Sequence, residues 1–263
     1  SSIMKQKALD LGKDDVWFEN NKLITEGSSN NTFIISNNGT LITRSLSTKI
    51  LPGITRKSIL EYAKRANFNI EEKPFTIEDT KNAKEAFSCS STTFIMPVIE
   101  IDDCKIGSGT PGKHTLELRK LYIKNVRKEA KQANKIIGTK RLYFEDLPAL
   151  RLNQIPTYKI SKIIDSYIKK IQPEIIFLPS GNDIHEDHKI IFKAAKVSVR
   201  INKKTTIKKI LSYEVLSETE WNENEKAFNP NYYVNLNKSN INDKVNAFLK
   251  YKSQIKKLPH PRS

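Results

Sequence analysis

Residues 25–43 read TEGSSNNTFIISNNGTLIT, in which two runs of strand-forming residues flank Asn37-Asn38-Gly39. Asn-Gly favours the positive backbone angles of a tight hairpin turn, so Thr32–Ser36 and Thr40–Thr43 are expected to be its strands. A second pair of short runs precedes them, Val16–Phe18 and Lys22–Thr25. Consecutive hairpins indicate an antiparallel sheet at the start of the chain.

After this sheet, the apolar residues recur first with the period of a helix, then with that of a strand, and then again with that of a helix. The expected elements are a helix over Arg56–Asn67, a helix start at Thr76 with Asp79, strands at Glu85–Ser88 and Phe94–Ile101, and a helix from Thr115 to Ile137 that Gly138 ends. Pro97 cannot donate to a β-ladder, so the strand that contains it is expected at a sheet edge. These elements predict an α+β first half.

The second half alternates strands with helices, which favours a parallel, Rossmann-like α/β layer. Strands are expected at Arg141–Phe144, Glu174–Leu178, Ile207–Val215 and Tyr232–Leu236, and helices at Tyr158–Ile171, Glu186–Val199 and Ile241–Gln254. We therefore expect two domains, residues 1–123 and 124–263, that meet within one continuous helix near residues 120–130.

The composition of the 263-residue chain is that of an ordinary globular protein, with 38% apolar and 28% charged residues and a net charge of +16. Only nine of the 45 basic residues are Arg, and Arg reads bases and phosphates better than Lys, so we expect no nucleic-acid partner. No apolar run reaches the roughly 20 residues of a membrane helix. The first residues lack the apolar core of a signal peptide, so a cytoplasmic location is expected. Cys89 and Cys104 are too few for a disulfide framework.

Three turns in the first half are rich in small residues or hydroxyl groups. Glu26 stands beside Gly27-Ser28-Ser29 after a strand, Leu51-Pro52-Gly53-Ile54-Thr55-Arg56 opens a helix, and Ser90-Ser91-Thr92-Thr93 follows a third strand. Backbone N–H groups at a helix start bind phosphate. Each turn taken alone has an ordinary structural explanation as a turn or a cap.

In their order and spacing, TEGSSNN, ILPGITR, SCSSTTFIMPVIEID and GTPGKHTLELRKLY resemble the C-terminal domain of class IV pyridoxal-phosphate aminotransferases, the D-amino-acid branch more than the branched-chain branch. The resemblance implies that Glu26 faces the pyridine nitrogen, that Ile54 and Thr55 bind the phosphate, and that Ser91 and Thr92 lie on the phosphate side. It also implies an amino-acid substrate and a homodimer. The family's Schiff-base lysine precedes the part that resembles residues 1–6, and Lys5 matches a different lysine.

A second group of polar residues follows the apolar run Ile175–Pro179, in the sequence Ser180-Gly181-Asn182-Asp183-Ile184-His185-Glu186-Asp187-His188. Ligands of open α/β sheets bind where a parallel strand ends and a helix begins. Zinc takes imidazole and carboxylate ligands, and a catalytic zinc keeps one position for water. From spacing alone, a metal site and a polar capping loop are equally good interpretations.

The surrounding segments, among them RLYFEDLPALRLNQIP and PEIIFLPSGNDIHEDHKII, resemble the zinc-dependent N-deacetylases of the PIG-L/LmbE type over residues 126–263. The resemblance implies that His188 is a zinc ligand, that His185 stabilises an oxyanion or acts as an acid, and that Asp187 orients His185. It implies N-acetylated amino-sugar substrates. The family's His-Pro-Asp-Asp motif, which supplies two ligands and the base, does not occur, and His260 has no assigned role.

Both sets of catalytic groups are thus partial, and groups that act as a unit fail together when one is lost. We interpret the chain as a chimera or fragment in which a class IV aminotransferase C-terminal domain precedes a partial Rossmann-like layer. The alternatives are a genuine bifunctional enzyme and a non-catalytic binding or scaffold protein.

Overall fold

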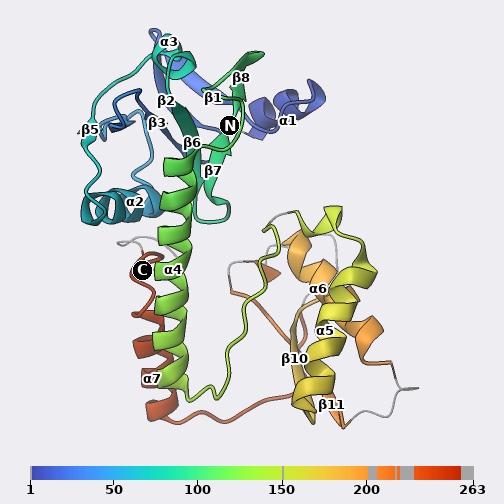
Figure 1. Cartoon of the computed structure of the whole chain (residues 1–263). Coiled ribbons are helices and arrows are strands. Elements are labelled where there is room, and N and C mark those ends of the chain that lie inside the picture. The colour runs from blue at the N-terminus through green and yellow to red at the C-terminus, as the bar shows by residue number, and fades with distance from the viewer. Residues whose placement is uncertain (1, 150, 201–205, 217, 220–227, 256–263) are drawn as a thin grey trace. The chain divides into compact units, whose positions relative to one another are not determined.

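The computed structural model describes residues 2–149, 151–200, 206–216, 218–219 and 228–255 (Figure 1). The chain packs into two compact units. The first, unit 1, contains residues 1–143 and 237–263, and the second, unit 2, contains residues 144–236. None of the helices in the described ranges has both the length and the apolar character that crossing a membrane requires.

Unit 1 is built around a five-stranded sheet with the strand order β5-β4-β3-β6-β7. Its strands are β3 (Asn31–Ile35), β4 (Leu41–Thr43), β5 (Ile70–Glu72), β6 (Glu85–Ser90) and β7 (Phe94–Val98). All neighbours pair antiparallel except β4 and β5, which are parallel. Two small antiparallel pairs accompany it: β1 (Trp17–Asn20) with β2 (Leu23–Gly27), and β8 (Glu100–Ile101) with β9 (Cys104–Lys105).

Successive side chains along these strands point to opposite faces of the sheet, so each face carries its own core. One face packs under α2 (Ile54–Arg65) and α4 (Lys113–Ile137), and its core contains Phe33, Phe87 and Tyr122. Phe33 and Phe87 stack with their ring centroids 4.7 Å apart. The opposite face carries Ile34 and Ile42, which pack with Phe75 next to the short helix α3 (Ile77–Lys81).

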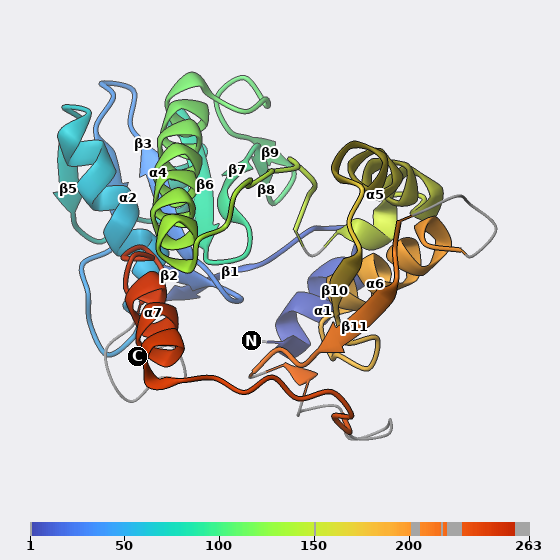
Figure 2. The ribbon, with the colours of Figure 1, turned by 90° about the horizontal axis from the view of Figure 1, so that it is seen from below.

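The remaining helices of unit 1 are α1 (Ser2–Asp10) and α7 (Lys238–Phe248). The helix α7 lies along α4 in both views (Figures 1 and 2), and the two helices are in contact. A piece of chain that the sequence assigns to the second half therefore packs on the first.

Unit 2 contains a parallel β–α–β arrangement. The strands β10 (Ile175–Pro179) and β11 (Lys209–Tyr213) pair in parallel, and α6 (Glu186–Ser198) connects them. The helix α5 (Thr157–Ile171) packs on α6, and their shared core of Leu152, Ile160, Ile190 and Ala194 includes the 3-10 turn Leu152–Gln154.

The structure confirms the expected mixed α/β and α+β class. Both N-terminal hairpins, the long helix ended by Gly138 at a φ of 80°, and the edge position of the strand with Pro97 are present. In the described part of the chain, no sheet combines strands of the two halves. The predicted boundary after residue 123 falls inside α4 and stays a prediction.

Three expectations about single elements are wrong. The segments Arg141–Phe144 and Tyr232–Leu236 are irregular instead of strands, and the closing helix ends at Phe248 instead of Gln254. Strand-forming composition alone does not make a strand, because a strand needs a ladder to pair with. The sequence also did not predict α1 or β5.

Candidate functional site

Glu26, near the end of β2, holds the loop that leads into α2. Its Oε2 atom accepts a hydrogen bond of 2.8 Å from the backbone N–H of Leu51. The carbonyl oxygen of Leu51 accepts a hydrogen bond of 2.9 Å from the side-chain amide of Asn31. Leu51 is thus held through both of its backbone polar groups, and the helix that begins three residues later is placed beside the Glu26 carboxylate. The other oxygen of Glu26 has no hydrogen-bond partner among the described residues.

The start of α2 has no side-chain cap. Gly53 is the N-cap residue, so no side-chain oxygen satisfies the first N–H groups of the helix. Ile54 is partly exposed, whereas Thr55 is only 2% exposed. The buried Thr55 Oγ1 makes no hydrogen bond of regular geometry in the described structure. An unsatisfied buried hydroxyl beside free N–H donors at the start of a 12-residue helix fits the phosphate of a cofactor.

The hydroxyl-rich turn between β6 and β7 is organised by Ser90. Its Oγ atom lies 3.1 Å from Thr92 Oγ1 and 2.8 Å from Thr93 Oγ1. Ser91 is partly buried and Thr92 is exposed. No hydrogen bond between described residues joins this turn to Glu26 or Thr55. The phosphate-side roles of Ser91 and Thr92 therefore stay predictions.

The loop after β10 is centred on Asp183, which is wholly buried. Its Oδ1 accepts a bond of 2.8 Å from the backbone N–H of His185, and its Oδ2 lies 2.9 Å from His188 Nδ1 and 3.1 Å from the Thr219 hydroxyl. Burial by itself raises the pKa of the Asp183 carboxyl, but the hydrogen bonds from His185, His188 and Thr219 outweigh burial and lower it.

The two histidines of this loop stack on each other, with ring centroids 4.5 Å apart. His188 uses Nδ1 toward Asp183, which leaves its Nε2 atom for a ligand, as in carboxylate–histidine–zinc arrangements. His185 has a buried Nδ1 atom with no hydrogen-bond partner in the described residues.

Asp187 supports a different part of unit 2. Its Oδ1 accepts a bond of 3.2 Å from the backbone N–H of Leu152, at the start of the 3-10 turn. The sequence interpretation overlooked Asp183, although its position two residues before His185 is a signal, because Asp side chains commonly bond the backbone two residues on. The predicted role of Asp187 in orienting His185 stays a prediction.

The residues of this loop do not make a catalytic zinc site by themselves. Such a site takes three protein ligands and a water. Within the described ranges, no group of three His, Cys, Asp or Glu side chains is arranged to hold a metal ion. His260 lies outside the described residues.

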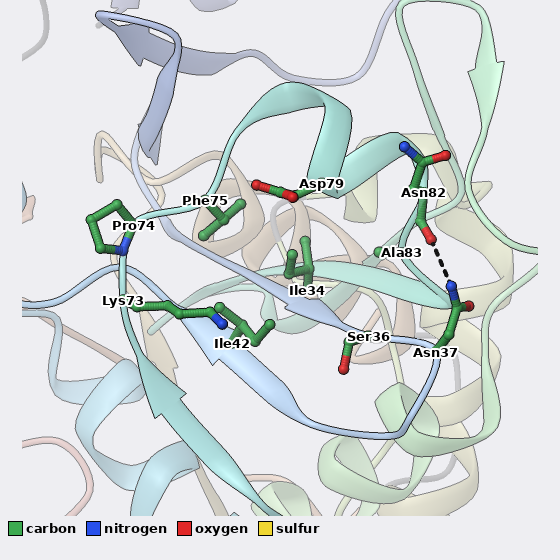
Figure 3. Close-up of a pocket in the computed structure, with 10 residues that line it drawn as sticks. All are labelled: Ile34, Ser36, Asn37, Ile42, Lys73, Pro74, Phe75, Asp79, Asn82 and Ala83. Carbon is green, nitrogen blue, oxygen red and sulfur yellow. Dashed lines mark hydrogen bonds between the residues drawn. The ribbon is translucent and has the colours of Figure 1, made fainter.

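A cavity of about 500 Å³ lies elsewhere, on the α3 side of the five-stranded sheet (Figure 3). Its floor is apolar and includes Ile34, Ile42 and Phe75, and its edge carries Lys73 and Asp79. The Asp79 carboxylate takes part in the capping box at the start of α3, where it accepts a hydrogen bond from the backbone N–H of Thr76. None of the predicted site residues lines this cavity.

Comparison with known proteins separates the chain into two matches. Residues 2–101 match the model of amino-transferase class IV, and residues 100–199 match that of GlcNAc-PI de-N-acetylase. The D-alanine aminotransferase of Bacillus licheniformis is 37% identical over 113 residues, which cover 43% of this chain and 40% of that protein. A probable branched-chain-amino-acid aminotransferase of Aquifex aeolicus is 36% identical over 129 residues, which cover 48% and 41% of the two chains.

Solved structures give the same partial match. The branched-chain aminotransferase of Thermobaculum terrenum in its PLP form is 30% identical, with a TM-score of 0.44 over 46% of this chain and 39% of that one. The chain thus spans about two fifths of the length of the relatives it matches. It joins a segment that resembles part of the class IV aminotransferases to a segment that resembles the GlcNAc-PI de-N-acetylases.

Proposed function

We propose that unit 1 provides one wall of a pyridoxal-phosphate site for amino-group transfer on D-amino acids or branched-chain amino acids. The observation that carries the proposal is the buried, unsatisfied Thr55 hydroxyl at the uncapped start of α2. The relatives support the chemistry, since they are D-alanine and branched-chain-amino-acid aminotransferases. Of the two substrate classes, D-amino acids are preferred, because the sequence motifs resemble the D-amino-acid branch more than the branched-chain branch.

In this proposal the chain's own residues have separate tasks. Thr55 and the backbone N–H of Ile54 bind the phosphate end, where the positive end of the helix dipole adds to the attraction. The carboxylate of Glu26 keeps a proton on the pyridine nitrogen. When bound, the cofactor supplies an electron sink for the substrate amine. The hydrogen bond from Leu51 N–H to Glu26 ties these two ends of the site to one another.

We also propose that unit 2 provides part of an N-deacetylase-type site for N-acetylated amino sugars, which this chain does not complete. The observation that favours it is the contact between Asp183 and His188, which orients an imidazole at the end of a parallel strand.

We further propose that neither half works alone as a complete catalyst, that the first unit pairs with a second copy, and that the protein acts in the cytoplasm. A bifunctional enzyme and a scaffold protein remain the alternative outcomes of the tests.

The decisive experiment for the first proposal is a titration of the full chain with pyridoxal phosphate, followed by absorbance and by competition with inorganic phosphate. Thr55→Val removes the hydroxyl while keeping the side-chain volume, and we expect it to weaken binding roughly tenfold. Thr32→Val is the matched control, because Thr32 also has a buried hydroxyl without a hydrogen bond but lies on β3. Equal effects of both substitutions, or no phosphate competition, would refute the proposal.

A further inference from the structure

The carboxylate of Asp15, just before β1, accepts hydrogen bonds from three donors. Its Oδ1 atom accepts a bond of 2.8 Å from the backbone N–H of Val16 and one of 2.5 Å from the Ser28 hydroxyl. Its Oδ2 atom accepts a bond of 2.6 Å from the side-chain amide of Asn30. An ionised carboxylate only accepts, and its two oxygens are enough for all three donors. Asp15 therefore holds two residues of the turn that joins β2 to β3.

The turn of residues 27–30 is closed and tight. The backbone N–H of Gly27 donates a hydrogen bond of 2.8 Å to the carbonyl of Asn30, and that of Ser28 donates one of 3.1 Å to the carbonyl of Val16. A Cβ atom at Gly27 would lie 2.1 Å from Asn30 Oδ1, so the Asn30 amide lies directly against the bare α-carbon of the glycine. The position of this amide, which Asp15 holds, is thus part of the shape of the turn.

The two residues that flank this turn both hold Leu51. Glu26 precedes the turn, and its Oε2 atom accepts from the Leu51 N–H at 2.8 Å. Asn31 follows the turn, and its side-chain amide donates to the Leu51 carbonyl at 2.9 Å. Only residues 27–30 separate the acceptor from the donor, so the shape of the turn sets their spacing. Through the turn, Asp15 thereby controls how Glu26 meets the loop that leads into α2.

We propose that Asp15 is a positioning residue for the cofactor site, which holds the turn of residues 27–30 and so keeps the Glu26 carboxylate where it serves the pyridine nitrogen. The inference rests on the proposed function of unit 1, in which Glu26 keeps a proton on that nitrogen. It adds a residue that lies outside the three turns of the proposed site. The ligand chemistry is that of an aromatic nitrogen base that carries a positive charge when protonated.

The first test needs no cofactor, because the Leu51 N–H reports where Glu26 lies. Asp15→Asn leaves one of the three donors without an acceptor in either orientation of the amide. We expect hydrogen exchange of the Leu51 amide, followed by NMR on the full chain, to become roughly fivefold faster. The Thr115 amide donates to Glu85 in the same unit and should exchange at its usual rate. Asp10→Asn, an exposed residue of α1, is the matched control and should change neither amide.

The second test follows the absorbance of bound pyridoxal phosphate as a function of pH. A carboxylate beside the pyridine nitrogen raises the pKa of the ring, so a displaced Glu26 should lower the midpoint of the titration by about one pH unit in Asp15→Asn. The dissociation constant of pyridoxal phosphate should rise roughly fivefold. Ser28→Ala removes one of the three donors and should act in the same direction with a smaller effect. Asp10→Asn should bind and titrate normally.

Other outcomes separate this inference from the proposed function. If Asp15→Asn speeds exchange of the Leu51 and Thr115 amides equally, Asp15 only stabilises unit 1 and the inference is wrong. An unchanged midpoint in Asp15→Asn, while Thr55→Val weakens binding, leaves the proposed function standing and overturns the inference alone. If the unaltered chain binds no pyridoxal phosphate, the proposed function fails and the inference fails with it.

Discussion

The Nδ1 atom of His188 lies 2.9 Å from the Oδ2 atom of Asp183, whose side chain is wholly buried. The contact fixes the direction of the imidazole ring, so that Nε2 is the nitrogen left for a ligand. It also shows how a loop between a parallel strand and a helix arranges its polar side chains around one carboxylate.

Zinc binding by the unaltered chain is predicted to be weak and to depend on His188, because the described residues supply fewer than three converging ligands. Asp183→Asn should weaken it further, by roughly tenfold, since the ring orientation is lost. Isothermal titration with zinc measures both effects, and His114→Ala, an imidazole outside this loop, is the control. No release of amine from N-acetylglucosamine-type substrates is expected. Turnover that disappears in His188→Ala would contradict this prediction.

Covalent attachment of pyridoxal phosphate to one lysine is predicted not to occur in this chain. By resemblance, the attaching lysine is not among residues 1–6, and Lys5 matches another position. Lys49, which precedes the loop of Leu51, is held by a hydrogen bond of 2.9 Å to Asn20. Borohydride reduction followed by peptide mass mapping tests this prediction. One stoichiometrically modified lysine, at Lys5 or Lys49 for instance, would show it to be wrong.

Gly53→Ala is predicted to weaken phosphate-dependent binding about fivefold. A Cβ atom at this position would lie 2.2 Å from Asn31 Oδ1, so the Asn31 amide that bonds the Leu51 carbonyl must move. Asn31→Ala removes the obstruction together with the bond, so the double variant should bind no worse than Asn31→Ala alone. The same titration with pyridoxal phosphate measures all three variants. Additive losses would mean that Gly53 acts in some other way.

Glu85→Gln is predicted to destabilise unit 1 by about 1–2 kcal/mol. The Glu85 carboxylate accepts from the backbone N–H groups of His114 and Thr115 and so caps the start of α4. Burial raises the pKa of this carboxyl, but the bonds from Thr115 and His114 outweigh burial and lower it below its ordinary value of 4.5.

The pH dependence follows from the direction of that shift. Because the pKa is lower in the folded than in the unfolded chain, the stabilisation is complete above pH 4.5 and is lost as the pH falls through the folded-state value. Denaturant unfolding at several pH values between neutral and acidic measures this loss. The free energy of unfolding should fall less steeply with decreasing pH in Glu85→Gln than in the unaltered chain. Glu19→Gln is the control for a surface carboxylate on β1. The same pH dependence of the free energy of unfolding in Glu85→Gln and in the unaltered chain would contradict the stabilising role given to the Glu85 carboxylate.

Local patterns in the sequence were enough to predict most of the elements. Asn38-Gly39 between alternating apolar residues predicted the β3–β4 hairpin, Thr76 with Asp79 predicted a capped helix start, and Gly138 predicted the end of α4. These features depend on backbone angles and on contacts within a few residues, so the neighbouring residues determine them. The motifs of both families are also local strings, and they predicted the two family matches.

Only the tertiary structure decided which distant side chains meet. Nothing in the sequence places Gln254 against Tyr122, Glu26 against Leu51, or Asp183 at the centre of the histidine loop, since each contact depends on how whole elements pack. The irregular segments Arg141–Phe144 and Tyr232–Leu236 have the same cause, because a strand forms only where packing brings it a partner ladder. The candidate site residues can be named from the sequence, whereas their hydrogen-bond partners depend on the burial and packing that the folded chain alone provides.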